Sequence, residues 1–229
     1  QMSKENYENF LFKLYRRKKK EPIAYIVKKK EFWKNKFYVN KNVLIPRPES
    51  EFLVEESLKI ISKGQKKKLL EIGVGSGCII TSVLKDRKNC YAVGIDCCKK
   101  ALKIAKINAK LHHIENRIKI FKTDVDNFSS GKYDLIISNP PYIDKHQLKY
   151  LGVSKFEPHK ALNGGVDGIE VLKKVIFKAS ELLKINGKLI IEIGINQKYK
   201  VKKLLKNKNF FVKKIKKDLS GHDRCIVST

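Results

Sequence analysis

Strand-like and helix-like patterns alternate along most of this chain, and this alternation limits its fold more than any other feature. Short apolar runs typical of buried strands lie at 68–72, 90–95, 117–121, 133–138 and 187–193. Runs with helical spacing lie at 77–86, 98–111, 167–185 and 197–207. Such alternation predicts an α/β domain in which helices cover both faces of a parallel sheet.

The two ends of the chain depart from this alternation. Residues 4–16 predict a short amphipathic helix, and the basic run at 16–20 is interpreted as a solvated linker. Residues 32–38 and 43–45 predict a β-hairpin around Asn40 and Asn42, before a helix at 49–61 with acidic first turns. Residues 210–215 and 225–227 predict an antiparallel hairpin at the sheet edge. The longest irregular segment, 143–166, suggests a functional lid.

The charge of the chain invites a nucleic-acid interpretation but does not require one. The net charge is +28, and 45 of the 51 basic residues are lysines. A nucleic-acid reader usually relies more on arginine, whose planar group suits phosphates and guanine. We therefore interpret the lysines mainly as codon bias that spreads over solvated faces, and expect weak, nonspecific attraction to RNA or ribosomes.

Cysteine usage and hydropathy predict no metal, no disulfide framework and no membrane span. The five cysteines form no C-x-x-C pair. No stretch approaches the roughly 18 apolar residues of a membrane span. The N-terminus lacks the apolar centre of a secretory signal. We expect a cytoplasmic location, or an organellar matrix, and a monomer.

A glycine-rich turn follows the strand predicted at 68–72. The segment LLEIGVGSG (residues 69–77) contains three glycines, which let the backbone approach a ligand closely. The G-x-x-G end of a dinucleotide fingerprint is missing, since Ile80 stands three residues past Gly77. The segment instead resembles the first motif, E/D-x-G-x-G-x-G, of S-adenosylmethionine-dependent methyltransferases. It implies a class I, Rossmann-like methyltransferase with a mostly parallel seven-stranded sheet, in which Glu71 faces the methionine end of the cofactor.

Two acidic residues follow later strands. Asp96 ends the strand at 90–95 and can accept hydrogen bonds from both ribose hydroxyls of a cofactor. Its alternative role is to cap the helix at 98–111. Asp124, followed by Val125, comes after the strand at 117–121, near the expected adenine. Its alternative role is that of a turn or cap residue.

Asn139-Pro140-Pro141-Tyr142 stands at the carboxyl end of the strand at 133–138. The prolines end the strand because neither has an N–H to donate. Open α/β sheets bind ligands at this end of their strands. Such a loop can hold a planar group bearing an NH2, with the Asn139 oxygen and a proline carbonyl as acceptors and Tyr142 stacked on it. The alternative is a turn that merely caps the strand.

With these motifs assembled, the chain resembles the release-factor glutamine-N5 methyltransferases of the HemK/PrmC type. The resemblance runs from about residue 21 to the C-terminus. Its motifs are EPIAYI (21–26), EFW (31–33), IPRPESE (45–51), the glycine loop, SNPPYI (138–143), EP (157–158), ALNGG (161–165), EIG (192–194), Gln197 and DLSGHDR (218–224). The segment at 45–51 is the most specific, and Arg47-Pro48-Glu49 favours the release-factor branch over ribosomal-protein methyltransferases. Ser50 and Val74 each replace a commoner threonine.

The resemblance implies a reaction and a set of residues. The reaction is methyl transfer from S-adenosylmethionine to the amide nitrogen of the glutamine in the Gly-Gly-Gln loop of a peptide-chain release factor. It also implies a short N-terminal remnant of a substrate-docking domain at 1–20, a hairpin linker at 21–47 and a catalytic domain at 48–229. The expected catalytic residues are Asn139, Pro140 and Tyr142; Pro141 and Arg47 complete the substrate site. The expected cofactor residues are Glu71, Gly73, Val74, Gly75, Ser76, Gly77, Asp96, Asp124, Val125 and Asn139.

Other functions stay open at this point. Asn-Pro-Pro-Tyr also occurs in adenine-N6 methyltransferases of nucleic acids, where the loop would hold a flipped base. A glutamine methyltransferase acting on a ribosomal protein is a second alternative. A basic RNA- or ribosome-associated module with a vestigial cofactor site is a third. For Arg47, the alternative to a substrate contact is an ion pair with Glu49 or Glu51, while Glu157 is expected to brace the lid.

Overall fold

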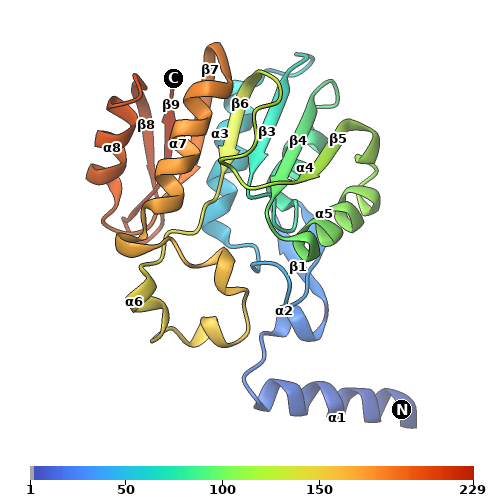
Figure 1. Ribbon diagram of the computed structural model, residues 1–229. Helices are drawn as coiled ribbons and strands as arrows, with labels where there is room; N and C mark the ends of the chain where they lie inside the picture. The colour runs from blue at the N-terminus through green and yellow to red at the C-terminus, as the bar shows by residue number, and fades with distance from the viewer. Residues whose placement is uncertain (1–2) are drawn as a thin grey trace.

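The computed structural model describes residues 3–229, apart from the side chains of residues 153 and 154, and a seven-stranded sheet forms its centre (Figure 1). The strand order is β5-β4-β3-β6-β7-β9-β8. Neighbours from β5 to β7 are parallel, whereas β9 runs antiparallel between β7 and the edge strand β8. The strands are β3 (Lys68–Ile72), β4 (Tyr91–Asp96), β5 (Ile118–Lys122), β6 (Tyr133–Ser138), β7 (Leu183–Glu192), β8 (Val212–Lys217) and β9 (Asp223–Ser228). The predicted sheet and its antiparallel C-terminal hairpin are confirmed.

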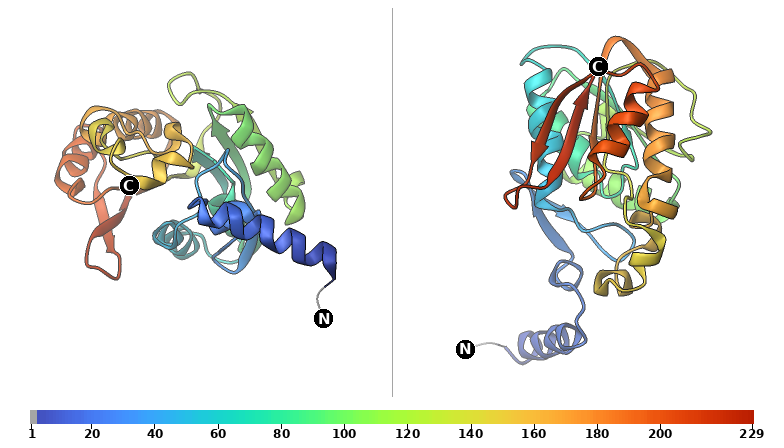
Figure 2. Two further views of the ribbon diagram at one scale, coloured as in Figure 1. Left: turned by 90° about the horizontal axis from the view of Figure 1, so that it is seen from below. Right: turned by 90° about the vertical axis from the view of Figure 1, so that its left-hand side faces the viewer.

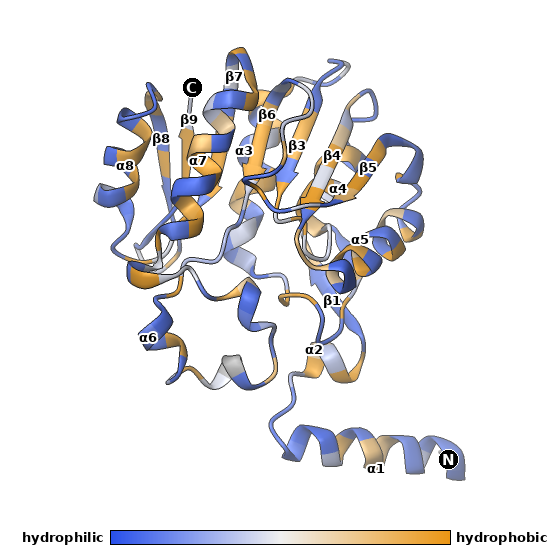
Figure 3. Ribbon diagram, in the orientation of Figure 1, coloured by the Kyte–Doolittle hydropathy of each residue, from blue (hydrophilic) through white to orange (hydrophobic). Residues whose placement is uncertain are grey.

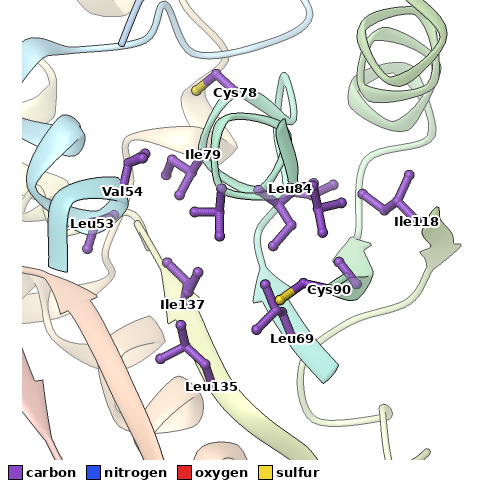
Figure 4. Packing of buried hydrophobic residues seen from close by; sticks show 14 of the residues in the cluster. Leu53, Val54, Leu69, Cys78, Ile79, Leu84, Cys90, Ile118, Leu135 and Ile137 are labelled. Atoms are coloured by element: carbon purple, nitrogen blue, oxygen red, sulfur yellow. The ribbon is translucent and has the colours of Figure 1, made fainter. Parts of the chain in front are cut away.

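Helices cover both faces of this sheet (Figure 2). One face carries α3 (Glu51–Ile60), α4 (Cys78–Asp86) and α5 (Lys99–Leu111); the other carries α7 (Glu170–Leu182) and α8 (Lys198–Lys206). Leu53 of α3, Leu84 of α4, Leu69 of β3 and Ile137 of β6 belong to one buried cluster, and Figure 4 shows Leu84 above Leu69 and Leu53 on the side of Ile137. Burial on both sides explains why the central strands are continuous apolar runs (Figure 3).

The order of the strands places a ligand crevice at one point of the sheet. The chain passes from β3 to β4 on one side, and later enters β6 on the other side of β3. The loops after β3 and β6 therefore diverge at the carboxyl ends of neighbouring strands. In doubly wound sheets this point is where ligands bind.

The N-terminal hairpin exists, but its predicted position is wrong. The strands are β1 (Lys29–Phe32) and β2 (Asn35–Tyr38), which pair antiparallel across a turn at 33–34. Residues 43–45 form no strand. Val43 and Ile45 are buried by packing instead, and the Tyr25 hydroxyl donates to the Val43 carbonyl at 2.6 Å. The apolar spacing of residues 43–45 therefore indicated correctly that Val43 and Ile45 are buried. It did not indicate that they belong to a strand.

The first helix, α1 (Lys4–Lys18), projects away from the body and buries none of its described residues (Figures 1 and 2). It includes the first three residues of the basic run at 16–20, which are therefore helical and not part of a linker, and Arg16 forms an ion pair with Glu21 at 2.5 Å. A short helix, α2 (Ile23–Ile26), follows. No described helix combines the length and the apolar composition required to cross a bilayer.

The remaining helices are short and lie in loops. The irregular segment at 143–166 folds into α6 (Lys145–Leu148), η3 (Gly152–Lys155) and η4 (His159–Ala161), and η5 (Val166–Gly168) leads into α7. Two more 3-10 turns are η1 (Pro48–Ser50), before α3, and η2 (Glu115–Arg117), before β5.

Candidate functional site

A cavity of about 340 Å³ opens at the carboxyl ends of the central strands. The loops after β3, β4, β5 and β6 line it, together with the segment before α3. The predicted residues that line it are Arg47, Glu71, Gly73, Val74, Gly75, Ser76, Asp96, Asp124, Val125, Asn139 and Pro141. Gly77, Pro140 and Tyr142 are neighbours of lining residues but are not among them. The structure thus gathers most of the predicted site around one cavity.

The glycine loop leaves its backbone open to this cavity. Gly77 has φ +76° and stands at the N-cap of α4, a conformation that a residue with a Cβ adopts at a cost. At Gly73, with φ +77°, an added Cβ would meet nothing within 4 Å. The amides of Gly73 and Val74 both donate to the Ile95 carbonyl at 2.9 Å, which ties the loop to β4.

Glu71 is a buried carboxylate at the end of β3. Its side chain accepts a hydrogen bond from the Ile80 amide in the first turn of α4 at 3.2 Å. Burial raises the pKa of Glu71 well above its usual value. A carboxylate held in this way favours a cationic ligand in the cavity, because positive charge relieves the cost of ionising it.

Asp96 combines the two roles considered for it. One carboxylate oxygen accepts from the Cys98 amide at 2.8 Å, immediately before α5, and the other accepts from the Gly75 amide at 3.0 Å. Burial raises the pKa of Asp96. An ionised carboxylate offers about four acceptor positions, so about two remain for hydroxyl groups of a ligand.

Asp124 and Val125 lie at the rim of the cavity. Asp124 is exposed and accepts a hydrogen bond from the Asp126 amide at 3.2 Å. Val125 is half-buried and packs against the apolar core on the α7 face. The turn role of Asp124 is therefore visible, and its place beside the cavity leaves the predicted adenine contact available.

Asn139 belongs to a chain of polar side chains that connects three segments. Its Nδ2 donates to the Ser50 hydroxyl oxygen at 2.8 Å. The Ser50 hydroxyl donates to Glu192 at 2.6 Å, and the Tyr142 hydroxyl donates to the other Glu192 oxygen at 3.2 Å. Ser50 and Glu192 were missed as site residues, although a glutamate closing an apolar strand was a signal that its carboxylate is held by partners.

Glu192 is fully enclosed by this arrangement. Its side chain is 1% exposed, and burial raises its pKa to about 7 against the hydrogen bonds from Ser50 and Tyr142. Burial and the nearby Glu192 charge also raise the pKa of Tyr142, so the phenol keeps its proton. Tyr142 therefore acts toward Glu192 as a donor.

The backbone of Tyr142 is held by a motif that the sequence singled out without a role. Gln197 donates through Nε2 to the carbonyls of Tyr142 and Gly168 at 2.9 and 3.0 Å, and accepts from the Gly194 amide at 2.8 Å. A Cβ added at Gly194 would lie 2.9 Å from the Tyr142 ring, and one added at Gly168 would overlap the Tyr142 carbonyl. Glycine at these positions lets the loop pack closely.

Arg47 pairs with the irregular segment rather than with its own neighbours. Its guanidinium donates to the buried carboxylate of Glu157, which also accepts from the Ile45 amide at 3.1 Å. The alternative considered for Arg47, an ion pair with Glu49 or Glu51, is therefore wrong, and the carboxylate that it meets is Glu157. The expectation that Glu157 braces the lid is supported by these contacts, which join the lid to the segment before α3.

The donor set of the cavity suits S-adenosylmethionine. Buried Glu71 suits a cationic group, Asp96 has acceptor positions left for a pair of hydroxyls, and the backbone at Gly73 is open to a ligand. Within residues 3–229, no group of three or more histidine, cysteine, aspartate or glutamate side chains is arranged to hold a metal ion.

Comparisons with known proteins agree with this geometry. Residues 49–163 match the family described as Methyltransferase small domain. A release factor glutamine methyltransferase from Buchnera aphidicola subsp. Schizaphis graminum is 40% identical over 224 residues, which cover 97% of this chain and 81% of that protein. A bifunctional methyltransferase from Rickettsia typhi is 36% identical over 99% of this chain. The alignment covers 48% of the Rickettsia protein, so the chain spans about half the length of that relative.

Solved structures confirm the fold. A methyltransferase from Pyrococcus furiosus superposes with a TM-score of 0.62 at 18% identity, covering 99% of this chain and 98% of that one. The predicted class I methyltransferase fold is confirmed, and the matched methyltransferase domain confirms the predicted cofactor, S-adenosylmethionine. The 40% identity over most of both chains and the matched domain together show that this chain belongs to the release factor glutamine methyltransferase family.

Proposed function

We propose that this protein methylates the side-chain amide nitrogen, N5, of the glutamine in the Gly-Gly-Gln loop of a peptide-chain release factor, in support of translation termination. The single observation that carries the proposal is the orientation of Asn139. Its NH2 group is taken by Ser50, so its oxygen is left as an acceptor at the cavity. An acceptor at this place suits an incoming amide NH2.

The cofactor site follows from the lining residues. The glycine loop at 73–77 would hold the methionine part of S-adenosylmethionine with Glu71, while Asp96 would accept the ribose hydroxyls and Asp124 and Val125 would flank the adenine. The cofactor supplies an electrophilic methyl group. Arg47, beside the cavity and joined to the lid through Glu157, would line the entry of the substrate.

The protein's own contribution is to position a weak nucleophile. An amide nitrogen is a poor nucleophile because its lone pair is delocalised into the carbonyl. Asn139 Oδ1 and the Pro140 carbonyl would each accept a hydrogen bond from one N–H of the substrate amide. Tyr142 would pack beside the plane of that amide. Fixing the reacting groups in line can lower a barrier by roughly 7–11 kcal/mol in favourable cases. The extra proton leaves the nitrogen after transfer, which requires no strong base.

Three further observations support the proposal. Relatives that share most of this chain are named for release factor glutamine methylation. The segment at 45–51, specific to the release-factor branch by resemblance, supplies Ser50 and Arg47 to the site. The exposed helix α1 would help to dock the protein substrate, since its apolar side chains are not used in packing against the catalytic body.

The test is methyl transfer from labelled S-adenosylmethionine to a purified release factor. A release factor with its Gly-Gly-Gln glutamine changed to alanine, a ribosomal-protein substrate and duplex DNA serve as alternative acceptors. The proposal predicts label on the intact release factor alone. Label that persists on the glutamine-to-alanine factor, or appears on DNA or the ribosomal protein instead, would contradict it.

A further inference from the structure

The polar side chains behind Asn139 form a chain of hydrogen bonds with one direction. Glu192, as a carboxylate, can only accept. The Ser50 hydroxyl has a single hydrogen, which points to Glu192 across 2.6 Å. Ser50 Oγ is therefore left as an acceptor toward Asn139, at 2.8 Å. The carboxamide of Asn139 must turn its NH2 group to Ser50.

We infer that Glu192, acting through Ser50, is a positioning residue that keeps the Asn139 oxygen turned toward the cavity. The inference rests on the proposed function and extends it to residues that do not touch the substrate. Ser50 and Glu192 are 2% and 1% exposed, so water does not compete for their hydrogen bonds. Asn139 Oδ1 has no donor among the hydrogen bonds of the described residues, which leaves it free for a ligand.

The orientation matters because an asparagine side chain can present either an acceptor or a donor. If it is rotated by half a turn, Asn139 offers NH2 to an incoming NH2, and both groups then lack an acceptor. A buried polar group left without a partner is strongly unfavourable. Correct binding of an amide substrate therefore depends on the polarity of the Ser50–Glu192 pair.

The surroundings of Glu192 make the direction of the Ser50–Glu192 hydrogen bond sensitive to pH. Tyr142 donates to it, Arg224 from β9 favours its charged form, and Glu49 from η1 opposes that form. Cys225, paired with Glu192 across β7 and β9, stays a neutral thiol because burial raises its pKa. Burial outweighs these partners and raises the pKa of Glu192 to about 7.

Protonation of Glu192 means that the hydrogen bonds from Glu192 through Ser50 to Asn139 no longer have a fixed direction. A protonated Glu192 can donate its own hydrogen to Ser50 Oγ, and the Ser50 hydrogen is then free to bond Asn139 Oδ1. Both orientations of Asn139 become possible. We expect kcat for glutamine methylation to fall as pH decreases through about 7, while cofactor affinity changes little.

Kinetics with matched variants test the inference. Ser50→Ala should lower kcat on the order of 10–100-fold without a change in cofactor Kd, because misorientation of a reacting group has effects of this size. Ser50→Thr keeps the hydroxyl and should restore kcat. Glu192→Gln can donate or accept toward Ser50, so its kcat should be lower and independent of pH between 6 and 8.

Ser57→Ala is the control, since the buried Ser57 hydroxyl on α3 bonds only the Leu53 carbonyl. Wild-type kcat in Ser50→Ala, or a wild-type pH profile in Glu192→Gln, would overturn the inference.

A second readout needs neither cofactor nor substrate. In ¹⁵N-labelled protein, the side-chain NH2 signal of Asn139, identified by its loss in Asn139→Ala, should shift with a midpoint near pH 7 and should not shift in Glu192→Gln. If the signal behaves so while no glutamine is methylated, the proposed function fails and the positioning chain stands. If the release factor is methylated but the signal ignores pH in wild type, the inference fails and the proposed function stands.

Discussion

Glu71 lies one residue before the end of β3 and Glu192 is the last residue of β7, and the side chain of each is about 1% exposed. Burial raises the pKa of both side chains. Their partners differ: Glu71 accepts one backbone amide, whereas Glu192 accepts two hydroxyls. At the residue scale, burial therefore disfavours the ionised forms of Glu71 and Glu192. A cationic ligand can stabilise the charge of Glu71, and the hydroxyl donors stabilise that of Glu192.

The raised pKa of Glu192 predicts a pH-dependent stability difference. The folded protein binds this proton more tightly than the unfolded chain does, so the favourable contribution is complete below pH ~4.5 and is lost as pH rises through about 7. Glu192→Gln lacks this titration. Relative to the variant, wild type should lose on the order of 3 kcal/mol of unfolding free energy between pH 4.5 and 8. Urea denaturation of both proteins across this range measures the difference, and a constant difference would contradict the account.

At the element scale, the loop after β6 packs closely against Gly168 and Gly194, and Gln197 donates a hydrogen bond to the Tyr142 carbonyl of this loop. Gly168, with φ +66°, leaves no room for a Cβ against the Tyr142 carbonyl. Close backbone packing of this kind is hard to infer from sequence, because the glycine and its contact are 26 residues apart (168 − 142).

Gly168→Ala should therefore destabilise the fold. Overlap with a buried backbone typically costs about 1–3 kcal/mol, and the left-handed backbone adds to this. Gly152→Ala is the matched control, because an added Cβ there meets nothing within 4 Å and its φ is ordinary. Thermal unfolding of the two variants should separate them clearly. Equal melting temperatures would show that the loop adjusts without strain.

The elements themselves were largely predictable, and the exceptions have physical causes. The strand at 133–138 was placed with the bounds that the structure shows, because a run buried on both faces carries an unambiguous apolar signal. The hairpin was misplaced because the turn lies at Trp33, with φ +54°, where no glycine or asparagine marks it. Asn139 and Asp96 were identified from their positions after strands. Ser50, Glu192 and the Arg47–Glu157 pair were not, since each depends on contacts more than a hundred residues apart.

At the scale of the whole molecule, the sheet with its helices forms one body and α1 lies outside it (Figure 1). The apolar side chains of α1 are exposed, among them Phe10, Phe12 and Tyr15. Helical stability in proteins comes mostly from packing of an apolar face, which α1 lacks among the described residues.

Removal of residues 1–18 should leave the catalytic body intact. Because α1 buries none of its described residues, the melting temperature should change by less than roughly 2 °C. If α1 helps to dock the release factor, KM for the release factor should rise in the truncated protein while cofactor Kd is unchanged. A drop of many degrees would show that α1 supports the body, and an unchanged KM would contradict the docking role.

The most direct test of the central claim compares wild type with Asn139→Ala on the release-factor glutamine. Single-turnover methyl transfer and cofactor Kd are measured on the same preparations. We expect a loss of roughly 100-fold or more in the transfer rate. Cofactor Kd should change little, because Asn139 would mainly position the amide, whereas Glu71, Asp96 and the glycine loop would supply most of the contacts to the cofactor. A near-normal transfer rate in Asn139→Ala would contradict the role assigned to the loop.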